Sequence, residues 1–474
     1  MAKVIVVGAG LAGSLLAIFL AKRGIEVDVI EARSDMRKGP VDGGRSINLA
    51  LSDRGIAALR QVGMDEQVLD EAVPMYGRMI HSVGGETKLL PYSGRKGEHI
   101  NSVSRAGLNI ALMNEAEKYP GVQFIFNHRC IQFNTSVGEM MFANGRTMRG
   151  ETIIATDGAG SIIRESIAVG IPNFELSQVF LEHGYKELHI PAGPFGKFLI
   201  EKNALHIWPR HKFMMIALPN FDGSFTCTLF LADGSEPPAV AGGLTQPDGN
   251  PVAPSRKFQP LTTAGGSDDE PTFDQLNTKR SLLDFFHREF PDAVPLMPNL
   301  EEDFFRNPTG SLGTIRCWPW NFEDKVLLVG DSAHAMVPFY GQGMNCAFED
   351  VRVLGDLIDK YGTDWQTVFW KYGDLRKFNA DAIQDMAEEN FYEMRDATAD
   401  PVFQRKRELE TRLEQTYPDY FSKYSMVTFR EDLPYTVAKE KGNAQDRLLM
   451  EICACVDNAD DLNLDEVIEK IKSI

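Results

Sequence analysis

Cysteine is scarce in this chain, and its spacing excludes the usual cysteine-based frameworks. No two cysteines form a Cys-x-x-Cys pair, and no group of cysteines and histidines has the spacing of a zinc site. Free thiols in a reducing compartment are the simplest interpretation, so we expect a cytoplasmic protein without a metal site. The six cysteines are Cys130, Cys227, Cys317, Cys346, Cys453 and Cys455.

Basic residues and long apolar runs are also in short supply. The chain has 49 Lys and Arg against 67 Asp and Glu, a net charge of -18, which argues against binding to nucleic acid or to an anionic membrane surface. No apolar run reaches the roughly 20 residues of a membrane helix. The apolar stretch at residues 4–20 contains glycines that favour a strand, a turn and a helix over a signal peptide. At 474 residues, two or three subdomains are expected.

A glycine motif near the N-terminus predicts a dinucleotide site. Gly8-Ala-Gly10-Leu-Ala-Gly13 lies between a predicted strand at 4–7 and a predicted helix at 14–23, and a second strand at 27–30 ends at Glu31. In such a β-α-β unit, the glycines let a pyrophosphate approach the helix N-terminus and the acid binds a ribose hydroxyl. The alternative is a glycine-rich turn in an unrelated α/β domain.

A second motif lies far along the chain. The apolar run 326–329 predicts a buried strand, followed by Gly330-Asp331, Pro338 and two glycines, Gly341 and Gly343, that open a helix. This order suits a loop that brings backbone N–H groups to an anionic ligand. A third turn, Asp157-Gly158, follows another predicted strand. We therefore expect distant parts of the chain to close on one cofactor.

The remaining pattern predicts several regions. Residues 174–232 are rich in alternating strands, which predicts an antiparallel sheet, and 233–274 resembles a long flexible insertion. Helices are expected at 108–118, 349–361, 365–378, from about residue 380, at 405–416 and twice within 443–474. The predicted division is an FAD-binding part at 1–173 with 68–104 contributing to the substrate site, a β-rich substrate domain at 174–300, a second FAD-binding part at 301–378 and a helical region at 379–474.

The three motifs, in this order, resemble the single-component FAD-dependent aromatic hydroxylases of the para-hydroxybenzoate hydroxylase type. The resemblance implies an α/β fold in which a Rossmann-like FAD-binding domain is interleaved with a β-sheet substrate domain, followed by C-terminal helices. It also implies a set of residues that contact the cofactor. These are Gly8, Gly10, Leu11, Ala12, Gly13, Glu31, Arg33, Arg45, Arg105, Asp157, Asp331, Pro338, Gly341, Gly343, Met344 and Asn345.

Longer strings narrow the resemblance to the kynurenine 3-monooxygenases within that family. They include residues 44–51, 183–188, 204–209, 338–345 and 423–429. The likeness assigns Arg78, Tyr92 and Tyr424 to the amino-acid carboxylate of L-kynurenine and Asn390 to a polar neighbour. It assigns the apolar walls around the aniline ring to Ile216, Leu218, Phe230, Phe339 and Met394. Tyr340 occupies a position that varies in the family.

The resemblance also implies the reaction. NADPH reduces the flavin, O2 adds to it as a C4a-hydroperoxide, and the ring carbon ortho to the aniline nitrogen is hydroxylated, a step of tryptophan catabolism and NAD biosynthesis. No catalytic side chain is required. The absence of a second GxGxxG unit agrees with a family that has no separate NADPH domain. Eukaryotic members carry a C-terminal membrane segment, whereas this chain ends in a charged helical tail, so we expect a soluble, bacterial-type form.

The residues by themselves leave other interpretations open. A single arginine is usually a surface ion pair, and isolated tyrosines are usually core residues. His334 could be a base, but we interpret it as an ordinary helix-start residue. Glu393 could be a catalytic acid or an ion-pair partner, and we favour the ion pair. The flavoenzyme could instead hydroxylate another aromatic carboxylate or a phenol, or the chain could be a flavoprotein without catalysis. A homodimer is one open alternative for its assembly.

Overall fold

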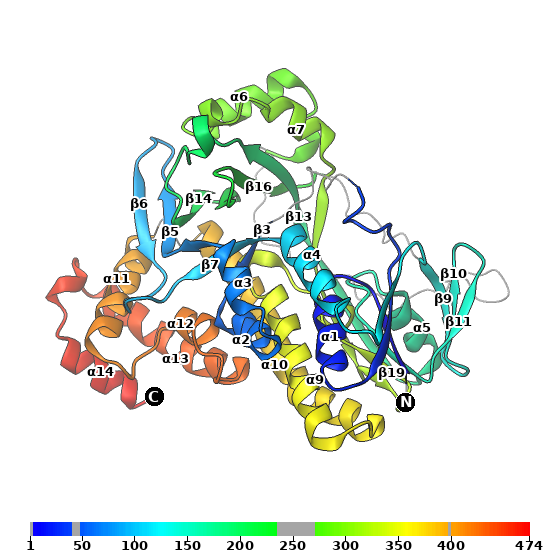
Figure 1. The fold of residues 1–474 in the computed structure, drawn as a ribbon. Coiled ribbons are helices and arrows are strands. Elements are labelled where there is room, and N and C mark those ends of the chain that lie inside the picture. The colour runs from blue at the N-terminus through cyan, green and yellow to red at the C-terminus, as the bar shows by residue number, and fades with distance from the viewer. Residues whose placement is uncertain (1–2, 40–47, 235–270, 397–399) are drawn as a thin grey trace.

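The structure is a computed structural model that describes residues 3–39, 48–234, 271–396 and 400–474. A mainly parallel sheet with its helices forms the lower part of the molecule in Figure 1, a mainly antiparallel sheet forms the upper part, and the helices within residues 401–472 lie together at the left. The candidate cofactor residue Arg45 lies outside the described residues, and so does most of the predicted 233–274 insertion.

A six-stranded sheet carries the N-terminal glycine motif. Its strand β1 (Lys3–Val7) pairs in parallel with β2 (Glu26–Ile30) on one side and with β12 (Thr152–Ala155) on the other. The side chains of Val4, Val6 and Val7 are buried, as expected for a parallel strand covered on both faces. In spatial order the strands are β18 (Asn321–Phe322), β19 (Val326–Leu328), β12 (Thr152–Ala155), β1 (Lys3–Val7), β2 (Glu26–Ile30) and β8 (Val122–Ile125).

Helix α1 (Leu11–Ala21) begins earlier than the predicted start at residue 14. Gly10 has an extended backbone at the N-cap, and the N–H of Ser14 donates to the carbonyl of Gly10 at 2.9 Å, which closes the first turn. The N-terminus of the helix therefore opens directly at the carboxyl edge of the parallel sheet. Helices α4 (Arg105–Ala116) and α9 (Gly343–Tyr361) pack against α1.

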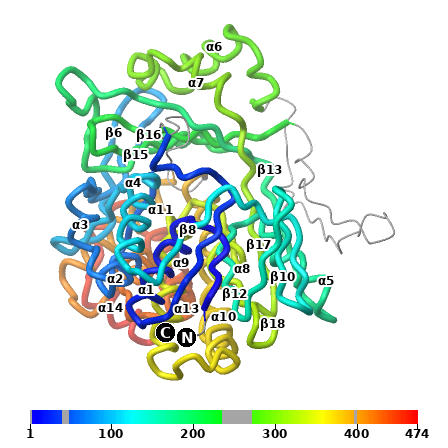
Figure 2. Tube along the Cα trace, turned by 45° about the vertical axis from the view of Figure 1, so that its right-hand side comes forward, coloured from blue at the N-terminus to red at the C-terminus, as the bar shows by residue number. Residues whose placement is uncertain are grey.

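A seven-stranded sheet forms the other main layer. Its strands are antiparallel except for the parallel pair β14 (Ala204–Arg210) and β5 (Gly77–His81). Helices α6 (Lys279–Glu289) and α7 (Leu300–Arg306) cover one face, as Figure 2 shows at the top of the molecule. Trp208 and Phe225 of the sheet are buried together with Phe286 of α6 in one hydrophobic core. In spatial order the strands are β17 (Gly310–Trp318), β13 (Glu175–Ile190), β16 (Phe225–Ala232), β15 (Phe213–Pro219), β14 (Ala204–Arg210), β5 (Gly77–His81) and β6 (Thr87–Pro91).

Two smaller sheets and several short helices lie along the chain between the strands of the two main sheets. One three-stranded sheet contains β3 (Asn48–Leu51), β7 (Ile100–Ser104) and β4 (Val73–Met75), and another contains β11 (Thr147–Arg149), β10 (Glu139–Phe142) and β9 (Cys130–Asn134). The short helices are α2 (Asp53–Val62), α3 (Asp65–Asp70), α5 (Ile162–Gly170) and α8 (Asp331–His334).

The C-terminal region is helical, as predicted, but one predicted break is wrong. Residues 365–378 and the helix expected from about residue 380 form one continuous helix, α10. The side-chain amide of Asn379 donates to the carbonyl of Leu375 at 3.0 Å, so this residue bonds within the helix and does not end it. The helices are α10 (Trp365–Asp396), α11 (Pro401–Thr416), α12 (Lys423–Thr428), α13 (Tyr435–Ala454) and α14 (Leu464–Lys472).

The predicted fold class is confirmed: a Rossmann-like domain is interleaved with a β-sheet domain and followed by helices. The predicted domain boundaries stay a prediction, and strands β5, β6 and β17 join the seven-stranded sheet from outside residues 174–300. Among the helices in the described ranges, none has the length and apolar character needed to cross a membrane.

Candidate active site

A cavity of about 900 Å³ runs between the parallel sheet and the face of the seven-stranded sheet that α6 and α7 do not cover. This is near the upper end of the roughly 300–1,000 Å³ found for ligand pockets, so there is room for a large cofactor beside a small ligand. At one end the cavity is lined by the glycine motif after β1, and at the other by residues of β5, β15, β16 and α12.

The glycine motif fits a dinucleotide. A Cβ on Gly8 (φ +106°) would lie 2.5 Å from the carbonyl oxygen of Thr156, and a Cβ on Gly13 would lie 1.9 Å from the carbonyl oxygen of Gly8. These two glycines are thus required by the packing of the protein itself. A Cβ on Gly10 would meet nothing within 4 Å. The space at Gly10 faces the cavity, where a pyrophosphate needs close access to the backbone.

Glu31 lies at the end of β2, where the ribose-binding acid is expected. Its carboxylate accepts hydrogen bonds from the backbone N–H of Ala9 at 2.9 Å and from Arg33 Nε at 2.8 Å. Burial would raise the pKa of Glu31, but the hydrogen bonds from Arg33 and Ala9 outweigh it and the pKa is lowered. The backbone N–H and Nη2 of Arg33 also donate to this carboxylate, at 2.9 and 3.4 Å, so a ribose hydroxyl would replace contacts that the exposed Arg33 side chain makes here.

The Asp157-Gly158 turn meets the second nucleotide motif. Burial raises the pKa of Asp157, and its Oδ1 has no hydrogen-bond partner among the described residues. Arg164 donates to the carbonyls of Ala159 and Ser332, at 2.6 and 3.0 Å. The guanidinium therefore ties the Asp157 turn to the short helix that begins with Asp331, and both segments line the cavity.

The loop before α9 is held by Asn345. The side-chain amide of Asn345 donates to the carbonyls of Gly341 and Ala50, each at 2.8 Å, and its oxygen accepts from the N–H of Ser52 at 2.9 Å. Gly341 has φ +66°, and α9 starts at Gly343. The N-terminus of α9 thus points its free N–H groups and positive dipole end at the cavity, where they suit the electron-rich edge of a reduced flavin.

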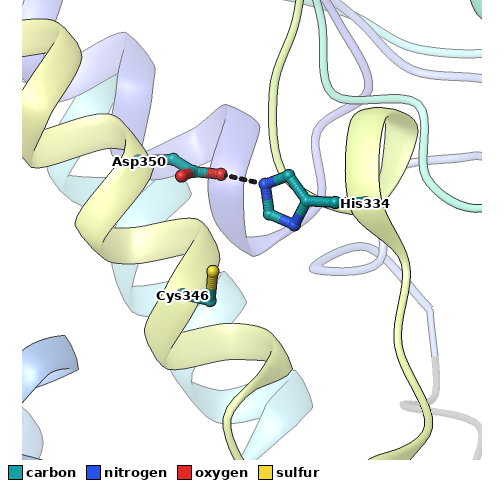
Figure 3. A group of neighbouring side chains, drawn as sticks. All are labelled: His334, Cys346 and Asp350. Carbon is teal, nitrogen blue, oxygen red and sulfur yellow. Dashed lines mark hydrogen bonds and ion pairs between the residues drawn. The ribbon is translucent and has the colours of Figure 1, made fainter. Parts of the chain in front are cut away.

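A buried group of His334, Cys346 and Asp350 lies behind this loop (Figure 3). His334 Nε2 and Asp350 Oδ2 are 2.6 Å apart, and Arg376 Nε donates to Asp350 Oδ1 at 2.6 Å. Burial would raise the pKa of Asp350, but His334 and Arg376 outweigh it and lower the pKa to about 2. Asp350 also accepts from the N–H of Gly330 at 3.2 Å. Because the guanidinium already faces both Asp350 and Cys346, the group acts as an ion-pair network that positions the Gly330-Asp331 turn.

At the other end of the cavity, Arg78 lies against two stacked tyrosines. The rings of Tyr92 and Tyr424 are 5.0 Å apart and nearly parallel, at 9°. Within the described chain, the Tyr92 hydroxyl and Arg78 Nε have no hydrogen-bond partner although both are buried. Burial raises the pKa of Tyr92 well above its ordinary value, so the hydroxyl remains a donor. Two orphaned donors on a cation and a phenol make a ready site for a carboxylate.

Aromatic and aliphatic side chains line the cavity next to these donors. The ring of Phe339 lies 5.0 Å from Phe230 and 4.5 Å from Phe391, and Ile216, Leu218 and Met394 complete the lining. Asn390 does not line the main cavity. Its side chain donates to the carbonyl of Phe339 at 2.6 Å, which makes it a support for the ring.

A small polar cavity of about 20 Å³ borders the site behind Arg78. Glu393 lies there, and its carboxylate is 3.7 Å from the guanidinium of Arg78. This distance agrees with the prediction that Glu393 is an ion-pair partner. Tyr340 lines both cavities, as do Arg78 and Tyr424, and its ring stacks on Tyr424 with ring centres 5.7 Å apart. The other charged residues around this space are Glu389, Lys406, Arg407, Glu410, Lys423 and Asp446.

The structure brings most of the sequence-predicted residues to one cavity. Gly13, Asn345 and Asn390 do not line it but support those that do. Sequence reasoning missed Gln178, Tyr185 and Thr228, which face the cavity from β13 and β16. The charged residues of α11 and α13 around the small cavity were missed as well, because charges on amphipathic helices are usually solvated and nothing in their spacing distinguishes them.

Comparisons with known proteins agree with this arrangement. The FAD binding domain family matches the chain over residues 1–218 and 314–366. A kynurenine 3-monooxygenase of Myxococcus xanthus is 44% identical over 476 residues, which cover 99% of this chain and 95% of that protein. The chain belongs to the kynurenine 3-monooxygenase family. A kynurenine 3-monooxygenase of Dictyostelium discoideum is 42% identical and covers 98% of this chain and 95% of its own length.

Solved structures similar to this member of the kynurenine 3-monooxygenase family are more distant. A 2-methyl-3-hydroxypyridine-5-carboxylic acid oxygenase aligns with a TM-score of 0.62 and 19% identity, covering 89% of this chain and 99% of that one. Klebsiella pneumoniae HpxO, complexed with FAD, aligns with a TM-score of 0.63 and 20% identity, covering 86% and 95%. These similarities show the shared fold. FAD is the cofactor, and the open cradle at Gly10 fits it.

Proposed function

We propose that this chain hydroxylates L-kynurenine to 3-hydroxykynurenine with FAD, NADPH and O2. The observation that carries the proposal is the pair of buried donors without a partner, Arg78 Nε and the Tyr92 hydroxyl. They lie at the end of an apolar cavity that the loop before α9 also lines. When these donors bind the carboxylate of a small aromatic amino acid, its ring extends towards Phe339 and the N-terminus of α9. The names of the relatives support L-kynurenine as that amino acid.

The balanced reaction consumes one NADPH, one proton and one O2 for each L-kynurenine, and yields 3-hydroxykynurenine, NADP⁺ and water. When bound, FAD supplies the redox chemistry: it accepts a hydride from NADPH and transfers one oxygen atom to the ring. The amino group of the aniline activates the ring carbon next to it. No side chain of the chain is assigned a nucleophilic role.

The side chains bind and orient the substrate and exclude water from the site. Arg78, Tyr92 and Tyr424 hold the carboxylate and thereby fix the distance of the ring from the α9 N-terminus. Phe230 and Phe339 pack on the ring and exclude water, which matters because water in the site favours loss of the oxygen as H2O2. The α9 N-terminus and Asn345 hold the flavin edge and stabilise negative charge on it.

A second candidate activity is hydroxylation of another aromatic carboxylate, since Arg78 would bind any such anion. We also propose a cytoplasmic location, because all six cysteines are free thiols.

The oligomeric state stays a prediction, and a homodimer is one expectation for it.

A substrate panel tests the proposal. NADPH oxidation by the FAD-loaded enzyme is measured with L-kynurenine, D-kynurenine, anthranilate and a phenol at equal concentrations. We expect strong stimulation by L-kynurenine and weak stimulation by anthranilate, whose carboxylate is attached directly to the ring and cannot reach Arg78 with the ring in the same place. No stimulation by L-kynurenine would overturn the proposal.

A further inference from the structure

Arg54 is one of the largest fully buried side chains in the described chain, yet it does not line the cavity. It lies on α2, in the FAD-binding half, and its whole side chain is shielded from solvent. A guanidinium in such a place must satisfy its donors within the protein, because burying an unpaired charge is costly. Its partners therefore show what it holds together.

Most of these partners belong to the C-terminal helices. Arg54 Nε donates to the carbonyl of Val427 at 2.7 Å, and Nη2 donates to the carbonyls of Leu433 at 2.5 Å and Met426 at 3.4 Å. Met426 and Val427 are in the last turn of α12, where carbonyls lack helical N–H partners. A cation at this end also interacts favourably with the helix dipole. Arg54 thus caps the helix that carries Tyr424.

The other side of Arg54 faces helix α9 and, through Tyr435, its N-cap. Its Nη1 lies 3.3 Å from Glu349 Oε1 on α9, the helix whose N-terminus opens at the cavity. The guanidinium carbon also lies 3.9 Å from the centre of the Tyr435 ring, and the Tyr435 hydroxyl donates to Gln342 Oε1 at 3.1 Å. Gln342 is the N-cap of α9. Arg54 and Tyr435 therefore connect α12 to both the N-cap and the second turn of α9.

We propose that Arg54 is a positioning residue that fixes the helix bearing Tyr424 relative to the flavin-holding end of α9. The inference rests on the proposed function, since it assigns Arg54 the task of setting the distance between bound carboxylate and flavin. A hydroxylase must hold that distance because an ångström-scale misplacement of the ring lowers the rate of oxygen transfer. Arg54 acts through Tyr424 and touches neither substrate nor cofactor.

The test compares Arg54→Gln with Arg210→Gln in the FAD-loaded enzyme. Arg210 is a matched control because it is also buried and donates to three backbone carbonyls, those of Glu289, His81 and Pro209. We expect Arg54→Gln to raise the KM for L-kynurenine by roughly tenfold with FAD retained, since three carbonyl partners lose a charged donor. The fraction of NADPH oxidation that yields product should fall, and Arg54→Lys should restore part of both. Arg210→Gln should leave KM and coupling unchanged.

A double-mutant cycle with Tyr424→Phe separates positioning from general destabilisation. If Arg54 acts through Tyr424, the Tyr424→Phe substitution should change KM much less in the Arg54→Gln background than in the wild type. If the fold-changes in KM of Arg54→Gln and Tyr424→Phe simply multiply in the double variant, the inference is overturned. For the control pair, Arg210→Gln with Tyr424→Phe, we expect the fold-changes to multiply. If Arg54→Gln does not fold, Arg54→Lys and Tyr435→Phe each take its place in the cycle with Tyr424→Phe.

Hydrogen exchange without substrate gives an independent readout. We expect faster amide exchange at residues 423–428 in Arg54→Gln and unchanged exchange there in Arg210→Gln; equal exchange at 423–428 in Arg54→Gln and wild type would contradict the capping role. A wild-type enzyme that forms no 3-hydroxykynurenine would refute the proposed function, whereas the exchange result would still decide whether Arg54 positions α12.

Discussion

The guanidinium carbon of Arg78 lies 5.2 Å from the centre of the Tyr424 ring, although Arg78 belongs to strand β5 and Tyr424 to helix α12 near the other end of the chain. The proposed carboxylate site thus combines residues of the β-sheet domain and of the C-terminal helices. Neither region contains the site alone, and the loop before α9 reaches the same cavity from the FAD-binding domain.

Replacing Arg78 tests the carboxylate site directly. We expect Arg78→Ala to lose roughly 2–5 kcal/mol of substrate binding, because a buried charge-assisted pair is removed, while FAD stays bound. Arg78→Lys should recover only part of this loss, since it keeps the charge but not the two-pronged geometry. Steady-state KM for L-kynurenine is the measurement. Lys88→Ala, at a half-exposed position on the neighbouring strand β6, is the control, and an equal KM for Arg78→Ala and Lys88→Ala would reject the role.

Tyr92→Phe should separate stability from binding. The hydroxyl is buried and has no partner among the described residues, so its removal should leave the Tm of the substrate-free enzyme unchanged or higher. The same change should weaken L-kynurenine binding by about 1–2 kcal/mol, the contribution of a hydrogen bond to a charged group. Thermal unfolding and KM are measured on one preparation. A lower Tm with unchanged KM would show that the hydroxyl serves the fold instead.

Gly10→Ala tests whether the space above the glycine motif belongs to the cofactor. The backbone of Gly10 (φ -74°) accepts alanine, and the added methyl group meets no protein atom within 4 Å. We therefore expect a folded protein that binds FAD at least tenfold more weakly, as judged from flavin fluorescence during dialysis. Gly13→Ala, where the new Cβ would lie 1.9 Å from the Gly8 carbonyl oxygen, should instead impair folding itself. Full FAD retention by a folded Gly10→Ala variant would argue against this placement.

His206 predicts a pH dependence of stability away from the active site. Its Nε2 lies 2.7 Å from the carbonyl of Glu201, its Nδ1 lies 2.8 Å from His81, and His81 contacts Asp292 at 2.7 Å. Burial lowers the pKa of His206 from 6.5 to about 4. Between these values the unfolded chain binds a proton that the folded chain does not, so stability falls as the pH falls from about 6.5 towards 4, by roughly 2–3 kcal/mol.

His206→Gln should flatten this dependence, because the amide can still accept from His81 but does not titrate. Urea unfolding at several pH values between 7 and about 4 measures it. Asp292, whose pKa is lowered because hydrogen bonds from His81 and Trp208 outweigh its burial, should leave a residual loss at the acid end. An unchanged slope in His206→Gln would contradict the assignment.

Local patterns predicted the Rossmann-like half well, because the spacing of Gly8, Gly10 and Gly13 and the apolar strands around them encode their own structure. The position of α1 shifted by three residues because the N-cap is set by the backbone of Gly10, which spacing alone does not reveal. The break expected near residue 379 was wrong because the side chain of Asn379 bonds back into its own helix.

Long-range partners could not be read from the sequence. Arg78, Tyr92 and Tyr424 were proposed only through family resemblance, since an isolated arginine or tyrosine carries no local signal of a site. The sequence did not point to Arg54, because its partners are backbone carbonyls of α12 and of the segment after it. Every residue has a backbone carbonyl, so the pattern of side chains does not indicate such a contact. Contacts of this kind emerge only when distant segments are packed together.

The most direct test of the account is the fate of oxygen in the wild-type reaction. The FAD-loaded enzyme is supplied with NADPH, L-kynurenine and ¹⁸O2, and the product is identified by mass spectrometry. The account predicts 3-hydroxykynurenine that carries one ¹⁸O atom, formed in near-equal amount to the NADPH oxidised. NADPH oxidation that yields only H2O2, or a hydroxylated product from anthranilate but not from L-kynurenine, would contradict it.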